Sequence, residues 1–467
     1  MLFSSISFIY YFLPIVLMLY FAVPFKYKNF ILLISSLFFY FYGEPIYSIL
    51  IIVSCVSGYL HGLWIEKLRK SRYAKLPLIC SIVFSIGFLL YFKYADFLIE
   101  NAIWVFDLKL KPLYVVLPIG ISFYTFQVLS YTIDVYKGEA KVQRNFFNFA
   151  AYVTLFPQLI AGPIVRYTTV EQELSHRNHS IDDFSYGVNR FIVGLSKKVL
   201  IANTLGELGK IFSNLQEQTI LFYWIAAIGF MLQIYYDFSG YSDMAIGLGR
   251  MFGFNFLENF NYPYISKSIT EFWRRWHISL GTWFRDYVYI PMGGNRVSKL
   301  RWTRNIFVVW FLTGFWHGAN WNFVIWGLYF GVFLVFEKFI LKDILNKLPS
   351  VIGHLYTLFF VLISFVIFNT NNMAEFIEYI KGMFGVLNIP FLNAEAVYYL
   401  KSYGLMLIIS AFGATPAAVK IIKNMKINKK GDFILNTLEP LVLVALLLLI
   451  TGYLVDGSFN PFLYFRF

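Results

Sequence analysis

Charged residues are scarce in this sequence of 467 residues. Asp, Glu, Lys and Arg together make up 14% of it, whereas soluble domains contain about a quarter. Hydrophobic residues reach 58%, and apolar runs recur along the whole chain instead of gathering at one end. A water-soluble fold is therefore excluded, and the pattern predicts an all-α, polytopic membrane protein.

Cysteines are few, and the familiar motifs of soluble enzymes are absent from the sequence. The two cysteines, Cys55 and Cys80, lie in apolar segments without the spacing of a metal site or a disulfide framework. The sequence contains no Walker-type phosphate loop, no HExxH and no GxSxG. These absences argue against a nucleotide-driven pump, and we expect neither a metal nor a permanently bound cofactor.

A formal charge of +13 would suit a nucleic-acid partner, but the Lys and Arg residues lie in short loops between apolar stretches. Such residues set membrane topology and contact lipid headgroups. Two basic loops, residues 66–75 and 420–430, should therefore be cytoplasmic. One apolar stretch, residues 438–455, follows the second loop, so the tail of residues 456–467 should be extracytoplasmic.

The apolar stretches define the expected membrane segments. A bilayer core about 30 Å thick requires about 20 apolar residues per helix, and we expect about 11–13 segments in a single membrane domain over residues 1–467. Some are too short for a simple span, and one is interrupted by Pro118 and Gly120. Such breaks require an interior cavity or surrounding protein. The expected segments are 5–24, 29–42, 46–64, 76–93, 113–135, 146–163, 187–204, 219–250, 305–317, 321–340, 351–369, 403–419 and 438–455.

Residues 254–302 form a polar, aromatic and basic region without a stretch long enough to span the membrane. Its aromatic and apolar residues recur at helical spacing, which predicts an amphipathic or re-entrant helix at the interface. An ordinary aromatic anchor belt would give the same pattern. The spaced residues are Trp273, Trp276, Leu280, Trp283 and Tyr287, and between them lie Arg274, Arg275 and Arg285.

Two of the six histidines, His277 and His317, stand in motifs rich in Trp and polar residues. Counted from Arg304, a helix would carry the chain about 20 Å inward by His317. Ionisable residues at that depth usually mark a functional path, although a neutral histidine bonded to one carbonyl is the alternative. The flanking Gly314, Gly318 and Asn320 favour close backbone approach and extra polar partners, so we favour a functional His317.

Six ordered runs resemble the membrane-bound O-acyltransferase (MBOAT) family, in particular its bacterial alginate and peptidoglycan O-acetyltransferase branch. The resemblance covers roughly residues 1–340 and the extreme C-terminus. The runs are Leu117-Pro-Ile-Gly-Ile-Ser-Phe-Tyr-Thr-Phe-Gln127, Phe156-Pro-Gln-Leu-Ile-Ala-Gly-Pro-Ile-Val-Arg166, Tyr236-Asp-Phe-Ser-Gly-Tyr-Ser-Asp-Met-Ala-Ile-Gly247, Phe272-Trp-Arg-Arg-Trp-His277, Tyr289-Ile-Pro-Met-Gly-Gly-Asn-Arg296 and Phe315-Trp-His-Gly-Ala-Asn320.

The resemblance implies a multi-pass protein of the bacterial cytoplasmic membrane with a central tunnel open to both faces. His317 is then the central histidine, suited to take a proton from an acceptor hydroxyl near neutral pH. His277 is the second signature position, and direct chemistry and support of the donor end remain equally open for it. Acetyl-CoA is the expected acyl donor. The candidate donor-binding residues are Arg274, Arg275, Arg285 and Asn320, whose cationic members could instead bind lipid headgroups.

The expected product is an O-acetylated surface polysaccharide. No soluble catalytic domain is encoded here, so the final transfer should require an extracytoplasmic SGNH-type O-acetyltransferase as partner. The chain ends Phe462-Leu-Tyr464-Phe-Arg-Phe467, which resembles an aromatic C-terminal motif of this branch. Tyr464 is therefore a candidate acyl acceptor, and the alternative is an aromatic anchor.

Two other functions remain open from the sequence. D-alanyl transfer to teichoic acid from a carrier-protein thioester would use the same fold and histidine. A transporter with His317 as proton relay would belong to another class, and internal hydropathy symmetry would favour it. We see no such symmetry.

Overall fold

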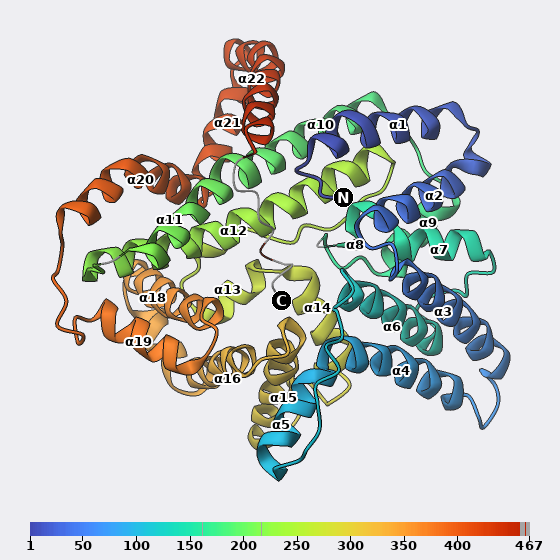
Figure 1. Ribbon diagram of the computed structural model, residues 1–467. Coiled ribbons are helices and arrows are strands. Elements are labelled where there is room, and N and C mark those ends of the chain that lie inside the picture. The colour runs from blue at the N-terminus through green and yellow to red at the C-terminus, as the bar shows by residue number, and fades with distance from the viewer. Residues whose placement is uncertain (161, 216, 458–462, 464–467) are drawn as a thin grey trace. The chain divides into compact units, whose positions relative to one another are not determined.

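The computed structural model describes residues 1–160, 162–215, 217–457 and 463, and every regular element among them is a helix (Figure 1). The predicted all-α fold is confirmed. The candidate acceptor Tyr464 lies outside the described residues.

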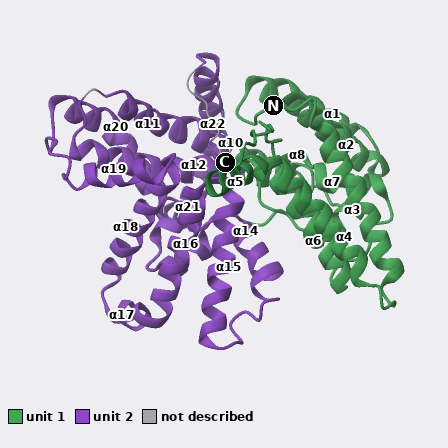
Figure 2. Cartoon of the chain, turned by 60° about the horizontal axis from the view of Figure 1, so that its bottom comes forward, with its two compact units in different colours: residues 1–191, 242–257 green, residues 192–241, 258–467 purple. Residues whose placement is uncertain are grey.

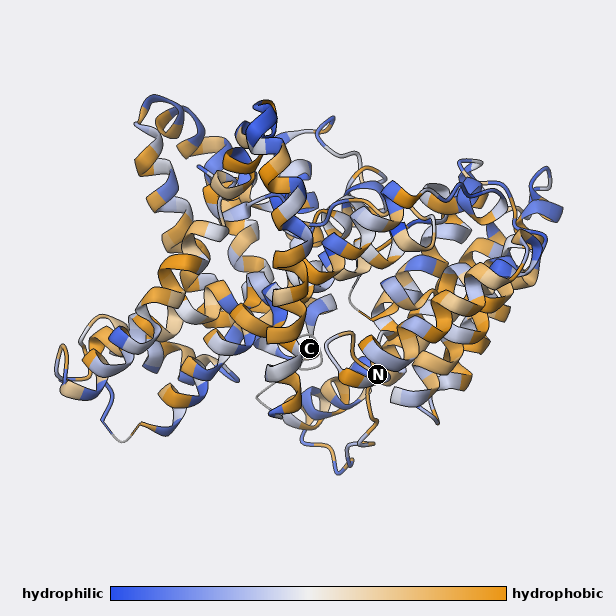
Figure 3. Cartoon of the chain, turned by 90° about the horizontal axis from the view of Figure 1, so that it is seen from above, coloured by the Kyte–Doolittle hydropathy of each residue, from blue (hydrophilic) through white to orange (hydrophobic). Residues whose placement is uncertain are grey.

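Seven described helices are long and apolar enough to cross a membrane, which confirms a polytopic membrane protein. The helices consist largely of hydrophobic residues, drawn in orange, while hydrophilic residues, drawn in blue, are more frequent in loops and at helix ends (Figure 3). The number of segments that cross the bilayer, predicted as about 11–13, stays a prediction. The seven are Ser48–Leu68, Lys75–Phe106, Ile220–Met251, Trp321–Lys347, Ser350–Asn369, Ala394–Gly413 and Lys429–Val455.

The chain divides into two compact units, residues 1–191 with 242–257 and residues 192–241 with 258–467 (Figure 2). The boundaries between the units in the sequence fall within α10 (Ile181–Ser196) and α12 (Ile220–Met251). The single membrane domain over 1–467 stays a prediction. The other helices of the first unit are η1 (Ser7–Phe12), α1 (Leu13–Ala22), α2 (Phe25–Gly43), α3 (Ser48–Leu68), α4 (Lys75–Leu89), η2 (Leu90–Tyr94), α5 (Ala95–Phe106), α6 (Ile121–Lys137), α7 (Phe146–Thr154), α8 (Phe156–Leu159) and α9 (Tyr167–Ser175).

The second unit contains both histidines of interest. Several of its helices begin at a side-chain cap, as Ser and Asn oxygens accept bonds from free backbone N–H groups. Its helices are η3 (Lys197–Ala202), α11 (Asn203–Asn214), η4 (Pro263–Ile265), α13 (Ile269–Arg275), α14 (Ile278–Phe284), η5 (Arg285–Tyr289), α15 (Lys299–His317), α16 (Trp321–Phe336), η6 (Glu337–Leu341), α17 (Lys342–Lys347), α18 (Ser350–Asn369), α19 (Met373–Met383), α20 (Ala394–Gly413), α21 (Ala417–Ile427) and α22 (Lys429–Val455).

Two expectations about local structure were wrong. The basic stretch 420–430 is not a loop, because α21 covers most of it and Asn428 caps α22 directly afterwards. Lysine is a good helix former, so charge alone does not indicate a loop. The helical spacing through 273–287 is also not one helix, since α13 ends at Arg275 and α14 begins at Ile278.

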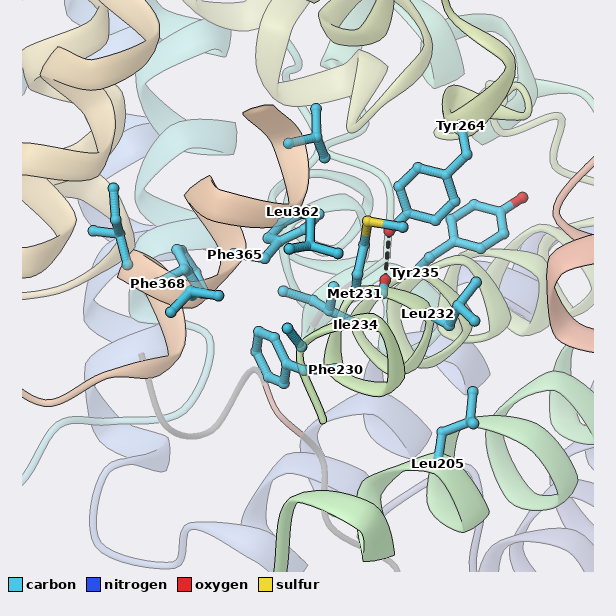
Figure 4. Packing of buried hydrophobic residues seen from close by; sticks show 14 of the residues in the cluster. Leu205, Phe230, Met231, Leu232, Ile234, Tyr235, Tyr264, Leu362, Phe365 and Phe368 are labelled. Atoms are coloured by element: carbon cyan, nitrogen blue, oxygen red, sulfur yellow. Dashed lines mark hydrogen bonds between the residues drawn. The ribbon is translucent and has the colours of Figure 1, made fainter. Parts of the chain in front are cut away.

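The buried core of the second unit joins α12, α13, α16 and α18 with aromatic and aliphatic side chains. Residues from α12 and α18 face one another in this core, and the Tyr264 hydroxyl donates to the Met231 carbonyl (Figure 4). This packing fixes the helices that hold the two histidines.

Candidate active site

His317 is the last residue of α15, which packs closely against α16. The close approach depends on glycines: a Cβ at Gly314 would lie 2.2 Å from the Phe323 carbonyl oxygen, and one at Gly327 would lie 2.2 Å from that of Trp310. No side chain larger than hydrogen fits at either position. The close backbone approach expected around His317 is therefore confirmed.

The His317 ring is buried among aromatic side chains, with 8% of the residue exposed. Its ring centroid lies 5.0 Å from both Trp316 and Trp326 and 5.4 Å from Phe368, in edge-to-face arrangements. Such surroundings disfavour a charged side chain. They suit a neutral imidazole.

His277 occupies the break between α13 and α14, with φ of +45° in the left-handed region. This conformation is uncommon for residues other than glycine, although His is among the more tolerant residues. It directs the buried ring against Phe238, at 4.6 Å between centroids, and toward the Asn259 side chain. A continuous helix through Trp276 would not present the ring in this way.

Asn259 determines which nitrogen of His277 carries the proton. Its Oδ1 accepts from the Ser279 backbone N–H at 3.1 Å and from the Ser279 hydroxyl at 2.9 Å. The same oxygen lies 3.2 Å from His277 Nδ1. Because this oxygen only accepts, Nδ1 must be the donor, and Nε2 is the nitrogen without a proton in the neutral ring.

Burial lowers the pKa of His277 well below its usual 6.5, and the nearby His317 lowers it further. His277 is therefore neutral at pH 7. The two rings also share a neighbour, since Trp316 lies 6.1 Å from His277 and 5.0 Å from His317 between centroids. The structure thus brings the two predicted histidines together.

A cavity of about 930 Å³ in the second unit is lined by His277 and by Thr313, one turn before His317 on α15. Arg274, Arg285 and Lys338 also line it, so the cavity combines cationic side chains with a neutral histidine. Its further lining includes Trp273, Tyr289, Asn295, Trp302, Trp310, Glu337 and Lys342.

Glu337 holds the helix that carries Arg274. It is buried, and its carboxylate accepts from the backbone N–H groups of Ile269 at 2.5 Å and Thr270 at 2.9 Å, and from the Thr270 hydroxyl at 2.6 Å. A carboxylate at a helix N-terminus is stabilised by the helix dipole. Glu337 therefore fixes α13 against η6 in the wall of the cavity.

The four candidate donor-binding residues do not gather at one place. Arg274 and Arg285 line the cavity. Arg275 instead forms an ion pair with Glu271 at 2.9 Å and donates to the Asn261 carbonyl. Asn320 caps α16 and donates to the Asn371 carbonyl. Donor binding by each of the four stays a prediction.

Sequence reasoning missed Glu337, Lys338 and Lys342, which line the cavity, and it missed Asn259. Lys338 and Lys342 follow the apolar segment of α16, and their charge at its end was the available signal. The Lys338 Nζ lies 3.6 Å from the centroid of Trp302. Asn259 carried no signal, because its contact with His277 spans 18 residues and depends on the bend between them.

A family model described as "MBOAT, membrane-bound O-acyltransferase family" matches residues 137–374, about half of the chain, including the cavity and both histidines. A relative that is 43% identical covers a still larger share. The chain belongs to this family. It is an acyltransferase and a multi-pass membrane protein.

The probable alginate O-acetylase of Pseudomonas aeruginosa is 43% identical over 389 residues, 82% of this acyltransferase and 75% of the relative. The peptidoglycan O-acetyltransferase of Helicobacter pylori is 33% identical over 438 residues, 86% and 83% of the two chains. The teichoic acid D-alanyltransferase of Bacillus subtilis is 30% identical over 272 residues, 54% and 68% of the two chains. The membership and branch inferred from the motifs are confirmed.

Proposed function

We propose that this MBOAT protein O-acetylates a cell-surface polysaccharide, taking the acetyl group from cytoplasmic acetyl-CoA and passing it through the bacterial cytoplasmic membrane. The observation that supports this most is the cavity, which joins Arg274, Arg285 and two lysines to His277 beside the buried His317. The two O-acetyltransferase relatives named above cover more of the chain than the D-alanyltransferase does.

The cationic side of the cavity suits the donor. Acetyl-CoA carries phosphates that cannot enter a bilayer core, whereas guanidinium and ammonium groups form strong charge-assisted bonds with phosphate oxygens. The thioester end would reach inward past His277, which stays neutral and does not compete for phosphate. Acetyl-CoA is then a substrate bound in turn, not a resident cofactor.

His317 would act as the general base. Its neutral imidazole takes the proton of the acceptor hydroxyl while the oxygen attacks the thioester carbonyl and forms the new ester bond. The carbon–sulfur bond breaks, and the leaving thiolate recovers the proton from the imidazolium. One acetyl ester and one free thiol result, so proton and electron pair are balanced without another reactant.

The first acceptor would be Tyr464, and an extracytoplasmic SGNH-type enzyme would move the acetyl group on to the polysaccharide. A phenol with a pKa near 10 is a better leaving group than a sugar alcohol. Transfer from thioester to aryl ester to alkyl ester therefore keeps each step feasible.

Kinetics with labelled acetyl-CoA on inverted membrane vesicles test the donor site. Arg274→Gln and Arg285→Gln should raise KM for acetyl-CoA several-fold and change kcat little, because binding is equally weakened before and during reaction. Arg275→Gln is the matched control, since its ion pair lies outside the cavity lining. Equal KM values in all three variants would contradict this donor site.

Tyr464→Phe tests the acceptor, because the variant keeps the ring and removes the one oxygen that could be acylated. We expect loss of polysaccharide acetylation at normal protein levels, with Phe465→Leu as a control that keeps Tyr464. Full activity of Tyr464→Phe would leave the tail as an anchor and send the acetyl group directly to the partner.

D-alanyl transfer is the second candidate, because a D-alanyltransferase relative shares about half of the chain. It predicts reaction with a D-alanyl carrier-protein thioester and none with acetyl-CoA. The same vesicle assay separates the two donors.

A further inference from the structure

One buried ion pair in the second unit is not part of the cavity lining and has no role in the chemistry above. Lys198 of η3 and Asp237 of α12 are 2.6 Å apart, and their side chains are only 3% and 4% exposed. A buried pair of this kind seldom stabilises a fold more than apolar residues of similar volume would. We therefore expect this ion pair to have a functional role.

The pair contacts the C-terminal tail. The backbone N–H of Leu463 donates to Asp237 Oδ2 at 3.0 Å, while Oδ1 faces Lys198. Leu463 is 6% exposed and belongs to the buried cluster of the second unit. A hydrogen bond from an uncharged amide to a buried carboxylate is stronger than one between neutral groups. Leu463 is thus held inside the unit.

This anchor lies close to the histidine site. Asp237 precedes Phe238 on α12, and the Phe238 ring lies 4.6 Å from that of His277. The cluster that contains Leu463 also contains Trp326 and Phe368, which contact His317. The residue after Leu463 in the chain is Tyr464.

We propose that the Lys198–Asp237 pair is the docking site of the C-terminal tail, and that Asp237 is a positioning residue that delivers Tyr464 to the histidines by binding the Leu463 backbone. The docking is read from the contacts, whereas the delivery of Tyr464 rests on the proposed function. One oxygen of the Asp237 carboxylate pairs with Lys198, and the other accepts the hydrogen bond from Leu463.

The reaction rate of a single cysteine tests the docking without any activity measurement. In a Cys55→Ala and Cys80→Ala background, Leu463→Cys keeps the backbone N–H and places a thiol in the buried position. With purified full-length protein in nanodiscs, a water-soluble maleimide should label this thiol slowly. Addition of Asp237→Ala should speed labelling at least tenfold. Equal rates with and without Asp237→Ala, whether slow or fast, would overturn the docking.

Asp237→Ala removes the carboxylate that pairs with the buried Lys198, and this variant could fail to fold. Lys198→Met with Asp237→Leu removes both charges at similar volume, which is often neutral or stabilising. This double variant should melt near the wild-type temperature and still show fast labelling, and slow labelling of the folded double variant would contradict the proposal. Asp243→Ala is the control, because its 2.6 Å ion pair with Arg190 belongs to the other unit. It should leave labelling slow.

Polysaccharide acetylation then separates the docking from the acceptor role. Leu463→Pro deletes the one N–H that Asp237 accepts, and Leu463→Ala keeps it. We expect at least a tenfold loss in the proline variant and a small loss in the alanine variant. If Asp237→Ala releases the tail while Tyr464→Phe and Leu463→Pro stay active, docking stands and the acceptor role fails. If Tyr464→Phe is inactive while labelling never changes, the acceptor role stands and docking fails.

Discussion

At the scale of single residues, Asn259 and the left-handed backbone at His277 set one ring in one tautomer. The same oxygen of Asn259 binds Ser279 and faces Nδ1 of His277. The sequence indicated that His277 matters but could not say how, because the partner is distant along the chain and the ring direction depends on φ. His277 is therefore better described by its contacts than by its motif.

Asn259→Ala should lower kcat about tenfold or more, within the range by which a misplaced acid or base slows reaction, and leave KM for acetyl-CoA unchanged. Without the acceptor, the proton of His277 is no longer held on Nδ1. Ser266→Ala is the matched variant, since it removes a buried bond to the Pro263 carbonyl and touches neither Asn259 nor His277, and it should stay near wild type. A kcat that falls equally in both variants would contradict tautomer control by Asn259.

The lowered pKa of His277 also predicts that the stability of the protein depends on pH. Its pKa is lowered on folding, so the unfolded chain binds more protons than the folded protein once pH falls below about 6.5, and stability is then lost toward lower pH. His277→Asn tolerates the left-handed backbone and cannot titrate. Its Tm should fall less than that of wild type between pH 7 and pH 5, and parallel curves would refute the assignment.

At the scale of elements, the lengths of the apolar stretches and the positions of the glycines were the features that best predicted the helices. Each expected membrane segment overlaps a described helix. The interruption expected at Gly120 is also present, because Gly120 has a φ of +76° and α6 begins directly after it. The predictions of local structure were wrong at two places. Residue spacing could not show the backbone bend at His277, and the basic residues of α21 were taken to indicate a loop. The pairing of Gly314 with Gly327 required knowledge of which helices touch.

Gly314→Ala should separate α15 from α16 and abolish activity, because its Cβ would lie 2.2 Å from a backbone oxygen that cannot move aside. Gly404→Ala is the control within a helix, since a Cβ there meets nothing within 4 Å. Alanine in place of glycine at an open helix position stabilises by up to about 1 kcal/mol. Thermal unfolding in detergent should show a lower Tm for Gly314→Ala and an equal or higher one for Gly404→Ala. Equal Tm values would mean that the contact is not required.

At the scale of the whole molecule, sidedness follows from the basic residues that flank the spans. Single cysteines at Arg72 and Lys423 should be protected from an impermeant thiol reagent in intact cells, whereas one at Asp456 should react. Permeabilised cells are the control, in which all three should label. Protection of Asp456→Cys with reaction of the other two would reverse the topology and place the tail on the donor side.

We propose His317 as the general base of acetyl transfer from acetyl-CoA, and proteoliposomes with labelled acetyl-CoA test this role most directly. His317→Ala should lower acetyl transfer by a factor of about 10² to 10⁴, the usual contribution of a general base, while the protein folds and inserts normally. His61→Ala is the matched control, because His61 bonds within its own helix to Ser57, and it should transfer at the wild-type rate. Wild-type transfer by folded His317→Ala would contradict the role of His317 as general base.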